Sequence, residues 1–245
     1  MNHFDLAYAF LVLLLAYTVM GITGFGSALI AVPLLAWKWP LPEVVALVIL
    51  LDVPASSLHA VLNRRQVRWE SVQAMLPGMA AGTLLGLWLI GSLDKRWPLL
   101  LLGLYIAWVG LRSLRSPASV TPGIKPTAYH LGSALAGMIE VMFATAGPIV
   151  VTLLQKRLTD IREIRATVPM GMVVAGSIAL MTLLPSSHAD AAQTLGRWVV
   201  AFPVSALSVF IGNRVAGHIP LPLMRRLMAL LLVCSGVALM QNFWH

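Results

Sequence analysis

Charged residues and cysteines are scarce in this sequence, and each scarcity excludes a class of protein. Charged side chains make up 11% of the 245 residues, against about 25% in soluble domains. Cys234 is the only cysteine, so a disulfide within the chain and a thiolate metal site are excluded. The sequence offers no HExxH motif and no usable carboxylate pair or Ser/His/Asp set. We therefore expect no enzyme, no cofactor and no bound metal.

Apolar residues dominate the chain instead. They form 59% of it, and the mean hydropathy is +0.86. This composition predicts a multi-pass membrane protein without a soluble domain, and we expect it in the plasma (inner) membrane. Asp5 stands before the first apolar run and no Lys or Arg does, so we expect no cleaved signal. The net charge of +8 comes from Lys and Arg in short loops, which suit the anionic headgroups of a lipid bilayer and not nucleic acid.

The apolar residues fall into eight segments, and one longer polar connector divides them. The connector, Ser116–Pro126, contains three prolines and a glycine and lies near the middle of the chain. We therefore expect a first transmembrane repeat over residues 1–115, a connecting loop over residues 116–127 and a second transmembrane repeat over residues 128–245. The segments are Leu6–Trp37, Pro42–Leu62, Ser71–Ile90, Trp97–Leu114, Ala128–Leu154, Ile164–Leu184, Leu195–Ile211 and Leu223–Phe243.

The first segment is too long for one straight crossing. Leu6 to Trp37 is a run of 32 residues without a charge, which is about 48 Å as a helix. The hydrocarbon core of a bilayer is only about 30 Å thick. Gly21, Gly24 and Gly26 lie inside the run and predict a break in the helix. Backbone groups freed by such a break need partners at membrane depth, and a bound substrate or ion is one.

A weak internal repeat relates the two halves. An offset of 119 residues aligns Val32-Pro33-Leu34-Leu35 with Val151-Thr152-Leu153-Leu154, and an offset of 120 aligns Glu43 with Glu163. Membrane chains rich in Gly, Leu and Ala also align by chance, but an offset of 126 superposes four Gly or Pro pairs, which favours a true repeat. These pairs are Pro77 and Pro203, Gly86 and Gly212, Gly91 and Gly217, and Gly110 and Gly236.

The distribution of basic residues favours one topology. If Leu6–Trp37 and Ala128–Leu154 each cross once, giving eight simple transmembrane helices, Lys and Arg divide 10 to 7 between the two sides. If each segment is a re-entrant hairpin, they divide thirteen to four, and the positive-inside rule prefers this arrangement. Each half then contains one glycine-broken hairpin and about three transmembrane helices. The predicted fold is therefore an all-α integral membrane protein of two inverted repeats, with both termini outside the cytoplasm.

The two breaks together offer a candidate anion site. Half-helices that start inside the membrane direct free N–H groups and positive dipole ends at a common point, and Pro148 suits such a helix start. The alternative is that glycines only allow close helix packing; we favour packing for Gly86, Gly91, Gly103 and Gly110, and the anion site for residues 21–27. The candidate substrate-binding residues are Thr23, Gly24, Phe25, Gly26, Ser27, Thr145, Gly147 and Pro148.

Two acids, Asp52 and Glu140, lie inside apolar segments. A carboxylate in lipid faces a cavity, pairs with another group or stays protonated, so both are candidates for proton coupling. The structural alternative is that they accept hydrogen bonds from backbone N–H groups at a break. For Asp52 the two interpretations, proton coupling and backbone hydrogen bonding, are equally favoured. For Glu140 backbone hydrogen bonding is slightly favoured. His59 is close to Asn63 and Arg64, and we expect it at the membrane interface, on roughly the opposite face of its helix from Asp52.

These motifs resemble those of a known family. Gly21-x-x-Gly24-Phe25-Gly26-Ser27 followed by Val32-Pro33-Leu34-Leu35 resembles the first signature of the TauE/SafE family, the sulfite exporters and toluene-sulfonate uptake permeases. The resemblance covers nearly the whole chain and implies a membrane transporter of small anions such as sulfite, sulfonates and sulfoacetate. In the second half only Gly147-Pro148 survives clearly from the family's glycine-rich run. The matching segments that follow the first signature are Leu51-Asp52-Val53-Pro54-Ala55, Arg64-Arg65, Val67-Arg68-Trp69 and Leu76-Pro77-Gly78 with Gly82 and Gly86.

We therefore expect a secondary transporter of a small organosulfur anion that works by alternating access with a coupled proton or ion. It can form a homodimer in the bilayer. Another small carboxylate or oxoanion is the alternative substrate, and a membrane scaffold or assembly protein without transport is the alternative from another class. A scaffold has no need for two polar, glycine-lined breaks that meet inside the membrane, so the geometry of the breaks distinguishes the two.

Overall fold

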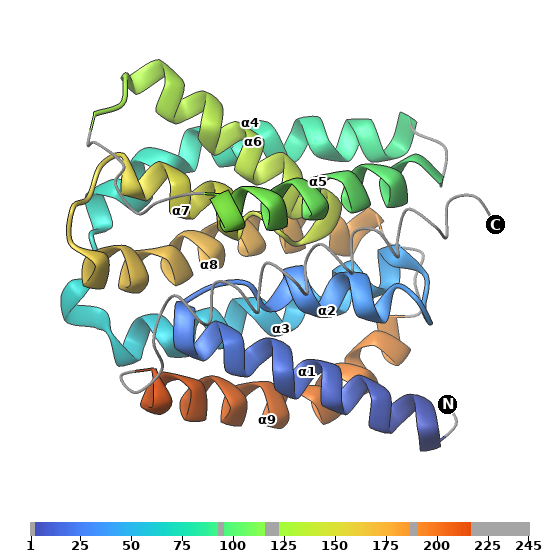
Figure 1. The fold of residues 1–245 in the computed structure, drawn as a ribbon. Helices are drawn as coiled ribbons and strands as arrows, with labels where there is room; N and C mark the ends of the chain where they lie inside the picture. Colours follow the sequence, from blue (N-terminus) through green and yellow to red (C-terminus); the bar gives the residue numbers. More distant parts are fainter. Residues whose placement is uncertain (1–2, 93–95, 116–122, 187–190, 217–245) are drawn as a thin grey trace.

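Most of the helices lie roughly along one axis and form a bundle (Figure 1). This computed structural model describes residues 3–92, 96–115, 123–186 and 191–216. Within these ranges the regular elements are nine α-helices and one 3-10 turn, with no strand, which confirms the predicted all-α class. Five of the helices are long and apolar enough to cross a membrane. The last predicted segment, Leu223–Phe243, lies outside the described residues.

Prolines mark the start of several helices. Pro42, Pro126 and Pro148 each lie in the first turn of a helix, where the missing proline N–H costs no hydrogen bond. The helices are α1 (His3–Thr23), α2 (Ser27–Leu35), α3 (Leu41–Leu62), α4 (Trp69–Ser92), α5 (Arg96–Arg115), α6 (Pro126–Phe143), α7 (Gly147–Gln155), α8 (Ile161–Ser186) and α9 (Ala191–Val215), with the 3-10 turn η1 (Arg64–Gln66) between α3 and α4.

Charged residues gather at the two ends of the bundle. The ion pairs among the described residues are Lys38–Asp5 at 2.8 Å, Arg197–Glu43 at 2.9 Å and Arg68–Glu163. The first two pairs lie at the end where α1, α3 and α9 begin, and the third lies at the opposite end. We call that opposite end, where α3 and α9 finish and α8 begins, the arginine-rich end. It carries Arg64, Arg65, Arg68, Arg157, Arg162 and Arg214.

The chain turns back on itself between α1 and α2, at residues 24–26. The Tyr8 hydroxyl, near the start of α1, donates a hydrogen bond of 2.9 Å to the Leu34 carbonyl near the end of α2. Just beyond α2, Lys38 reaches Asp5. The two helices are therefore antiparallel, and the start of α1 lies beside the end of α2.

A second reversal separates α6 from α7, at residues 144–146. The Arg157 guanidinium, just after α7, lies 4.4 Å from the centre of the Tyr129 ring in the first turn of α6. The Gly123 N–H donates to the Lys156 carbonyl at 2.9 Å. This antiparallel pair opens at the arginine-rich end, whereas the α1–α2 pair opens at the other end of the bundle (Figure 1).

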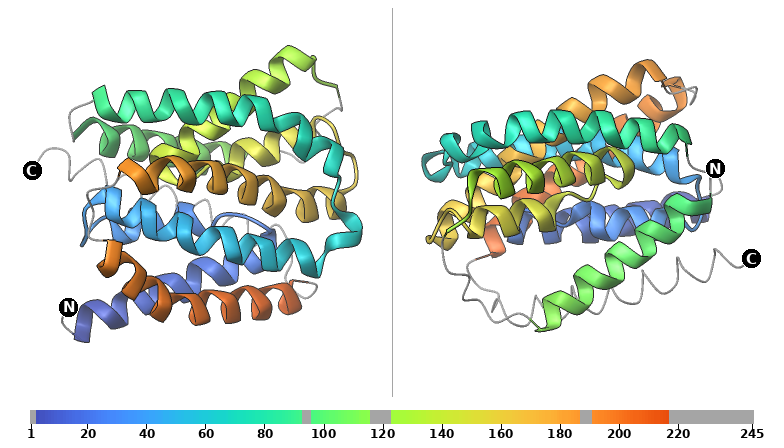
Figure 2. Two further views of the ribbon diagram at one scale, coloured as in Figure 1. Left: turned by 180° about the vertical axis from the view of Figure 1, so that it is seen from behind. Right: turned by 90° about the horizontal axis from the view of Figure 1, so that it is seen from above.

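Helices of the two halves pack in equivalent pairs. α1 packs on α9 as α6 packs on α4, and α9 packs on α3 as α4 packs on α8. α2 lies on α3 as α7 lies on α8, and α3 and α8 pack on each other. The views in Figure 2 place α3 and α8 side by side at the centre of the bundle. Each central helix thus carries the second helix of one broken pair, α2 on α3 and α7 on α8.

Glycines allow the closest of these helix contacts. A Cβ at Gly86 of α4 would lie 3.0 Å from the Met138 carbonyl oxygen of α6, and a Cβ at Gly212 of α9 would meet the Thr18 carbonyl of α1. The prediction of a packing role is therefore confirmed for Gly86. At Gly91 a Cβ would meet none of the described residues within 4 Å, so the structure shows no packing contact there.

Candidate functional site

The first break is a turn built from two glycines. α1 ends at Thr23, and Gly24 (φ 86°) and Gly26 (φ 98°) carry the chain into α2, which begins at Ser27. Most side chains are strained at such positive φ angles, so glycine stands where the turn requires it. The Thr23 hydroxyl lies 2.6 Å from the Phe25 carbonyl oxygen and accepts from the Phe25 N–H at 3.3 Å. Backbone groups freed by the break thereby find partners.

The second break repeats the start of this turn but not its end, because Ala146, the residue before α7, has φ -66° where Gly26 has φ 98°. Ala144 follows α6 with φ 57°, and it is the one non-glycine residue at positive φ in the described ranges. Its N–H bonds to the Glu140 carbonyl at 2.7 Å, just as the Gly24 N–H bonds to the Met20 carbonyl at 2.7 Å. Ala144 and Gly24 are 120 residues apart, and so are the two carbonyl residues Glu140 and Met20. The two breaks therefore correspond at an offset of 120, one residue more than the offset of 119 that aligns Val32-Pro33-Leu34-Leu35 with Val151-Thr152-Leu153-Leu154. α7 then begins at Gly147.

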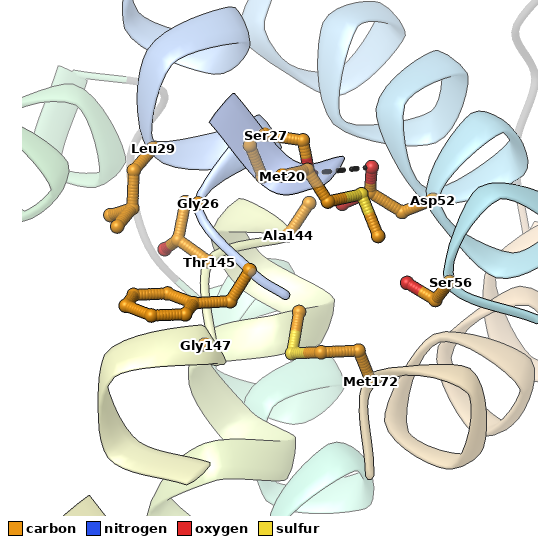
Figure 3. Close-up of a pocket in the computed structure, with 12 residues that line it drawn as sticks. Met20, Gly26, Ser27, Leu29, Asp52, Ser56, Ala144, Thr145, Gly147 and Met172 are labelled. Atoms are coloured by element: carbon orange, nitrogen blue, oxygen red, sulfur yellow. Dashed lines mark hydrogen bonds between the residues drawn. The ribbon is translucent and has the colours of Figure 1, made fainter. Parts of the chain in front are cut away.

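The two breaks meet and enclose a small cavity (Figure 3). A Cβ at Gly147 would lie 3.2 Å from Cδ2 of Phe25, and the Tyr105 hydroxyl donates to the Thr145 carbonyl at 2.9 Å. The cavity volume is about 10 Å³, which is room for about one water molecule. The cavity is lined by Met20, Phe25, Gly26, Ser27, Ala28, Leu29, Asp52, Ser56, Ala144, Thr145, Gly147 and Met172.

Asp52 brings a buried carboxyl group to this cavity. Its Oδ1 accepts hydrogen bonds from the Tyr17 hydroxyl at 2.6 Å and from the Ser27 hydroxyl at 2.9 Å, so one atom ties α3 to α1 and to the start of α2. Its Oδ2 is buried without a partner among the described residues, and so are Ser56 Oγ and Thr145 Oγ1. Leaving a buried polar atom unpaired is costly. These three atoms are therefore where the cavity would stabilise a water molecule, an ion or a ligand.

Glu140 holds the second break together. Its Oε2 accepts the N–H of Ala146, the residue before α7, at 3.0 Å. The alternative to proton coupling at Glu140 is that it accepts a hydrogen bond from a backbone N–H at the break, and this bond is present. Its Oε1 is buried without a described partner, and Glu140 is not among the residues that line the cavity. The two acids thus occupy different settings, one in the cavity wall and one behind a break.

The cavity includes most of the candidate substrate-binding residues. Those that line it are Phe25, Gly26, Ser27, Thr145 and Gly147. Thr23 and Gly24 shape the first break behind the lining residues, and Pro148 lies in the first turn of α7. The lining residues that sequence reasoning missed are Met20, Ala28, Leu29, Ser56, Ala144 and Met172. Ser56 could have been found, because it follows Asp52 by one helical turn, whereas the apolar residues carry no such signal.

The prediction that His59 lies on roughly the opposite face of its helix from Asp52 is wrong. The side chain is 0% exposed, and it lies on the same face of α3 as Asp52 because seven residues make nearly two helical turns. Its Nε2 is 3.3 Å from the Gly21 carbonyl oxygen. The same oxygen accepts a hydrogen bond of 3.2 Å from Arg165, which also donates to Asn213 Oδ1 at 2.9 Å. Four helices therefore meet at Gly21, between the cavity and the arginine-rich end.

The described residues combine five helices that could cross a membrane with two helix breaks that meet at a buried polar cavity. This combination is typical of a polytopic membrane transporter. The family model described as "Sulfite exporter TauE/SafE" matches residues 9–239, and the chain belongs to this family of membrane transporters. It is similar to the "Probable inner membrane transporter protein TsaS" of Comamonas testosteroni, with 58% identity over 199 residues that cover 81% of this chain and 83% of that protein. No solved structure shows a significant match. The resemblance found in the sequence is thus confirmed, and a multi-pass inner membrane protein is supported.

Proposed function

We propose that this transporter moves a small sulfur-containing anion, such as sulfite or a sulfonate, by alternating access, and that the anion binds between the two helix breaks. The description of the family names sulfite exporters, which makes sulfite the first anion to test. The observation that supports the site best is the cavity, because residues 25–29 and residues 144–147 line it from opposite broken pairs.

The chemistry of the cavity suits an anion. α2 and α7 both begin there, and the start of a helix offers free N–H groups and a positive dipole end. Ser27, Ser56 and Thr145 add hydroxyl groups, and no Lys or Arg is among the lining residues. The volume of about 10 Å³ is too small for a sulfonate, so this conformation corresponds to a closed state. The breaks would have to separate before an anion enters.

The proposed topology places the α1–α2 and α6–α7 pairs as re-entrant hairpins that enter from opposite sides of the membrane. Their open ends lie at opposite ends of the bundle, and the described helices of the two halves pack in equivalent pairs. Both observations support two inverted repeats joined by the loop at residues 116–127. The arginine-rich end would face the cytoplasm, and both termini would lie on the other side.

Asp52 is the proposed site of proton coupling. An ionised carboxylate and a bound anion would repel each other at the short distances of this cavity. A proton on the unpaired Oδ2 removes that repulsion, so proton and anion would bind together. Glu140 is the second candidate, because its own Oε1 is buried without a described partner. On this account an inward proton gradient drives uptake.

Reconstitution in proteoliposomes tests the proposal. Sulfite, thiosulfate, sulfoacetate and p-toluenesulfonate are offered with and without an inward proton gradient, and uptake of at least one should depend on the gradient. Gly26→Leu should abolish the flux, because it puts a large side chain at φ 98° in the cavity wall. Gly91→Leu is the matched control, since a Cβ at Gly91 would meet none of the described residues within 4 Å. No flux or binding of any of these anions would favour another substrate or the scaffold alternative.

A second variant tests the coupling residue. Asp52→Asn cannot carry the proton, so it should lose proton-driven uptake yet keep exchange of labelled for unlabelled anion across the membrane. Asp160→Asn, at an exposed acid near the arginine-rich end, is the control and should behave as wild type. Full proton-driven activity of Asp52→Asn would rule out the coupling role.

A further inference from the structure

A line of buried polar side chains runs along α3 from the cavity towards the arginine-rich end. Asp52, Ser56 and His59 have the spacing i, i+4, i+7, which places them on one helix face. Their exposed fractions are 3%, 0% and 0%. Each has one buried atom without a partner among the described residues, namely Oδ2, Oγ and Nδ1. Three such atoms in succession are costly in an apolar helix, so packing does not explain them.

The equivalent helix of the second half lacks this line. At the offset of 120 residues that relates the two breaks, the counterparts of Asp52, Ser56 and His59 on α8 are Met172, Gly176 and Ala179. α8 packs on α3 and occupies the matching place in the bundle. Since that helix is built without polar residues at these positions, the fold does not require them, which points to a role in function.

The geometry of His59 leaves one nitrogen ready to accept a proton. Its Nε2 lies 3.3 Å from the Gly21 carbonyl oxygen. A carbonyl can only accept a hydrogen bond, so Nε2 carries the ring hydrogen and Nδ1 bears a free lone pair. Ser56, which both donates and accepts, lies about 6 Å from Asp52 and about 4.5 Å from His59 along the helix axis. One water molecule can bridge each of these gaps.

We propose that Asp52, Ser56 and His59 form the path by which the coupled proton travels between the cavity and the arginine-rich end; this inference rests on the proton coupling proposed above. The proton leaves Asp52 Oδ2 through a bridging water to Ser56 Oγ, which passes its own hydroxyl proton through a second water to His59 Nδ1. The imidazolium then releases the Nε2 proton to a water molecule at the arginine-rich end. The neutral ring returns to its starting tautomer when water carries the remaining hydrogen from Nδ1 to Nε2, so no net charge stays behind.

The surroundings of His59 favour its neutral form, so His59 would pass a proton on and would not hold it. Arg165 from α8 is the charged group that acts on it, while Gly21 of α1 and Asn213 of α9 offer neutral groups. On its own helix Asp52 lies at the far end of the path, where Tyr17 donates to it. Because the guanidinium repels a second positive charge nearby, the imidazolium is short-lived and passes its proton on.

Two pairs of variants in proteoliposomes test the path, with p-toluenesulfonate and sulfite as the probe anions. His59→Gln removes the relay, and His130→Gln, at an exposed histidine of α6, is its control. Ser56→Ala is compared with Ser57→Ala, whose hydroxyl bonds to its own helix at the Val53 carbonyl. Proton influx is followed with an entrapped pH dye, and anion exchange without a gradient is measured separately.

The path predicts that His59→Gln slows proton-driven uptake about a hundredfold, the lower range for loss of a positioned proton-transfer group. Exchange should continue, because it needs no proton movement, and it also shows that the variant is folded. Ser56→Ala should slow proton influx relative to Ser57→Ala, and this comparison decides the matter if His59→Gln does not assemble. Unchanged proton influx in these variants, or equal loss of exchange and uptake, would overturn the path. If the wild-type protein shows no proton-driven uptake, the proposed function itself has failed.

Discussion

Replacing Gly147 with alanine should slow transport without unfolding the protein. Gly147 is the first residue of α7, and a Cβ there would lie 3.2 Å from Cδ2 and 3.3 Å from Cβ of Phe25 in the first break. Phe25 would have to shift slightly, and overpacking of this kind costs about 1 to 3 kcal/mol. The cost falls on the conformation in which the two breaks meet. Its population relative to open conformations should therefore fall by about 5- to 140-fold.

The stability of the whole fold should change much less. Alanine is preferred over glycine in a helix by about 1 kcal/mol, partly because it reduces the entropy of the unfolded chain. This gain offsets much of the strain against Phe25. Gly91→Ala is the matched control, because it brings the same helix preference at a position where the new Cβ meets none of the described residues within 4 Å.

The assay combines two measurements on the same preparations. The initial rate of anion uptake into proteoliposomes reports the closing of the breaks, and the midpoint of thermal unfolding in detergent reports the fold. Gly147→Ala should lose uptake at nearly unchanged stability, whereas Gly91→Ala should keep both. Wild-type kcat and KM in Gly147→Ala would refute the reasoning that the two breaks close against each other during transport.

Other changes test the fold. Ala144→Gly should raise the free energy of unfolding by about 1 kcal/mol, because it relieves a left-handed alanine; a loss of stability in thermal unfolding would contradict this. Gly82→Ala should lower it by about 1 to 3 kcal/mol, since a Cβ there overlaps the backbone of α6, and a neutral effect would argue against that contact. In a Cys234→Ser chain, cysteines at Lys38 and Arg157 should react with an impermeant reagent from opposite sides of the membrane; labelling of both from one side would exclude the hairpin topology.

Much of the helical scaffold could be predicted because the bilayer imposes it. An apolar segment has to match the thickness of the hydrocarbon core, and the predicted Pro42–Leu62 corresponds to α3 with a difference of one residue at its start. The break at Gly24 could be predicted as well, because positive φ leaves a clear preference for glycine. The second break carries a weaker signal, since Ala144 takes up the same conformation without a glycine.

The interior of the site was harder to predict, because its geometry comes from packing between distant segments. That Met172 lines the cavity depends on how α8 packs on α3, and nothing in its local sequence distinguishes it from a core residue. His59 shows a different difficulty. Its helix face follows from its spacing to Asp52, but its burial depends on Gly21 of α1 and on Arg165 of α8. Neighbouring polar residues in the sequence indicate the interface and say nothing about these distant partners.

The equivalence of the two halves extends to the packing of their helices and not to the chemistry of their side chains. At the offset of 120 residues, Asp52 corresponds to Met172, and both line the cavity; Glu140 corresponds to Met20, which lines it while Glu140 does not. If the two helix pairs move as the proposed inverted repeats, they would open the cavity to either side, since each break starts with a residue at positive φ and its helices have equivalent packing partners. A proton, however, meets a carboxyl group on one wall only. The proposed proton path leads from Asp52 past His59 to the arginine-rich end of the bundle only. In alternating access the anion would therefore reach the cavity from both sides of the membrane, whereas the proton would leave it towards the arginine-rich end.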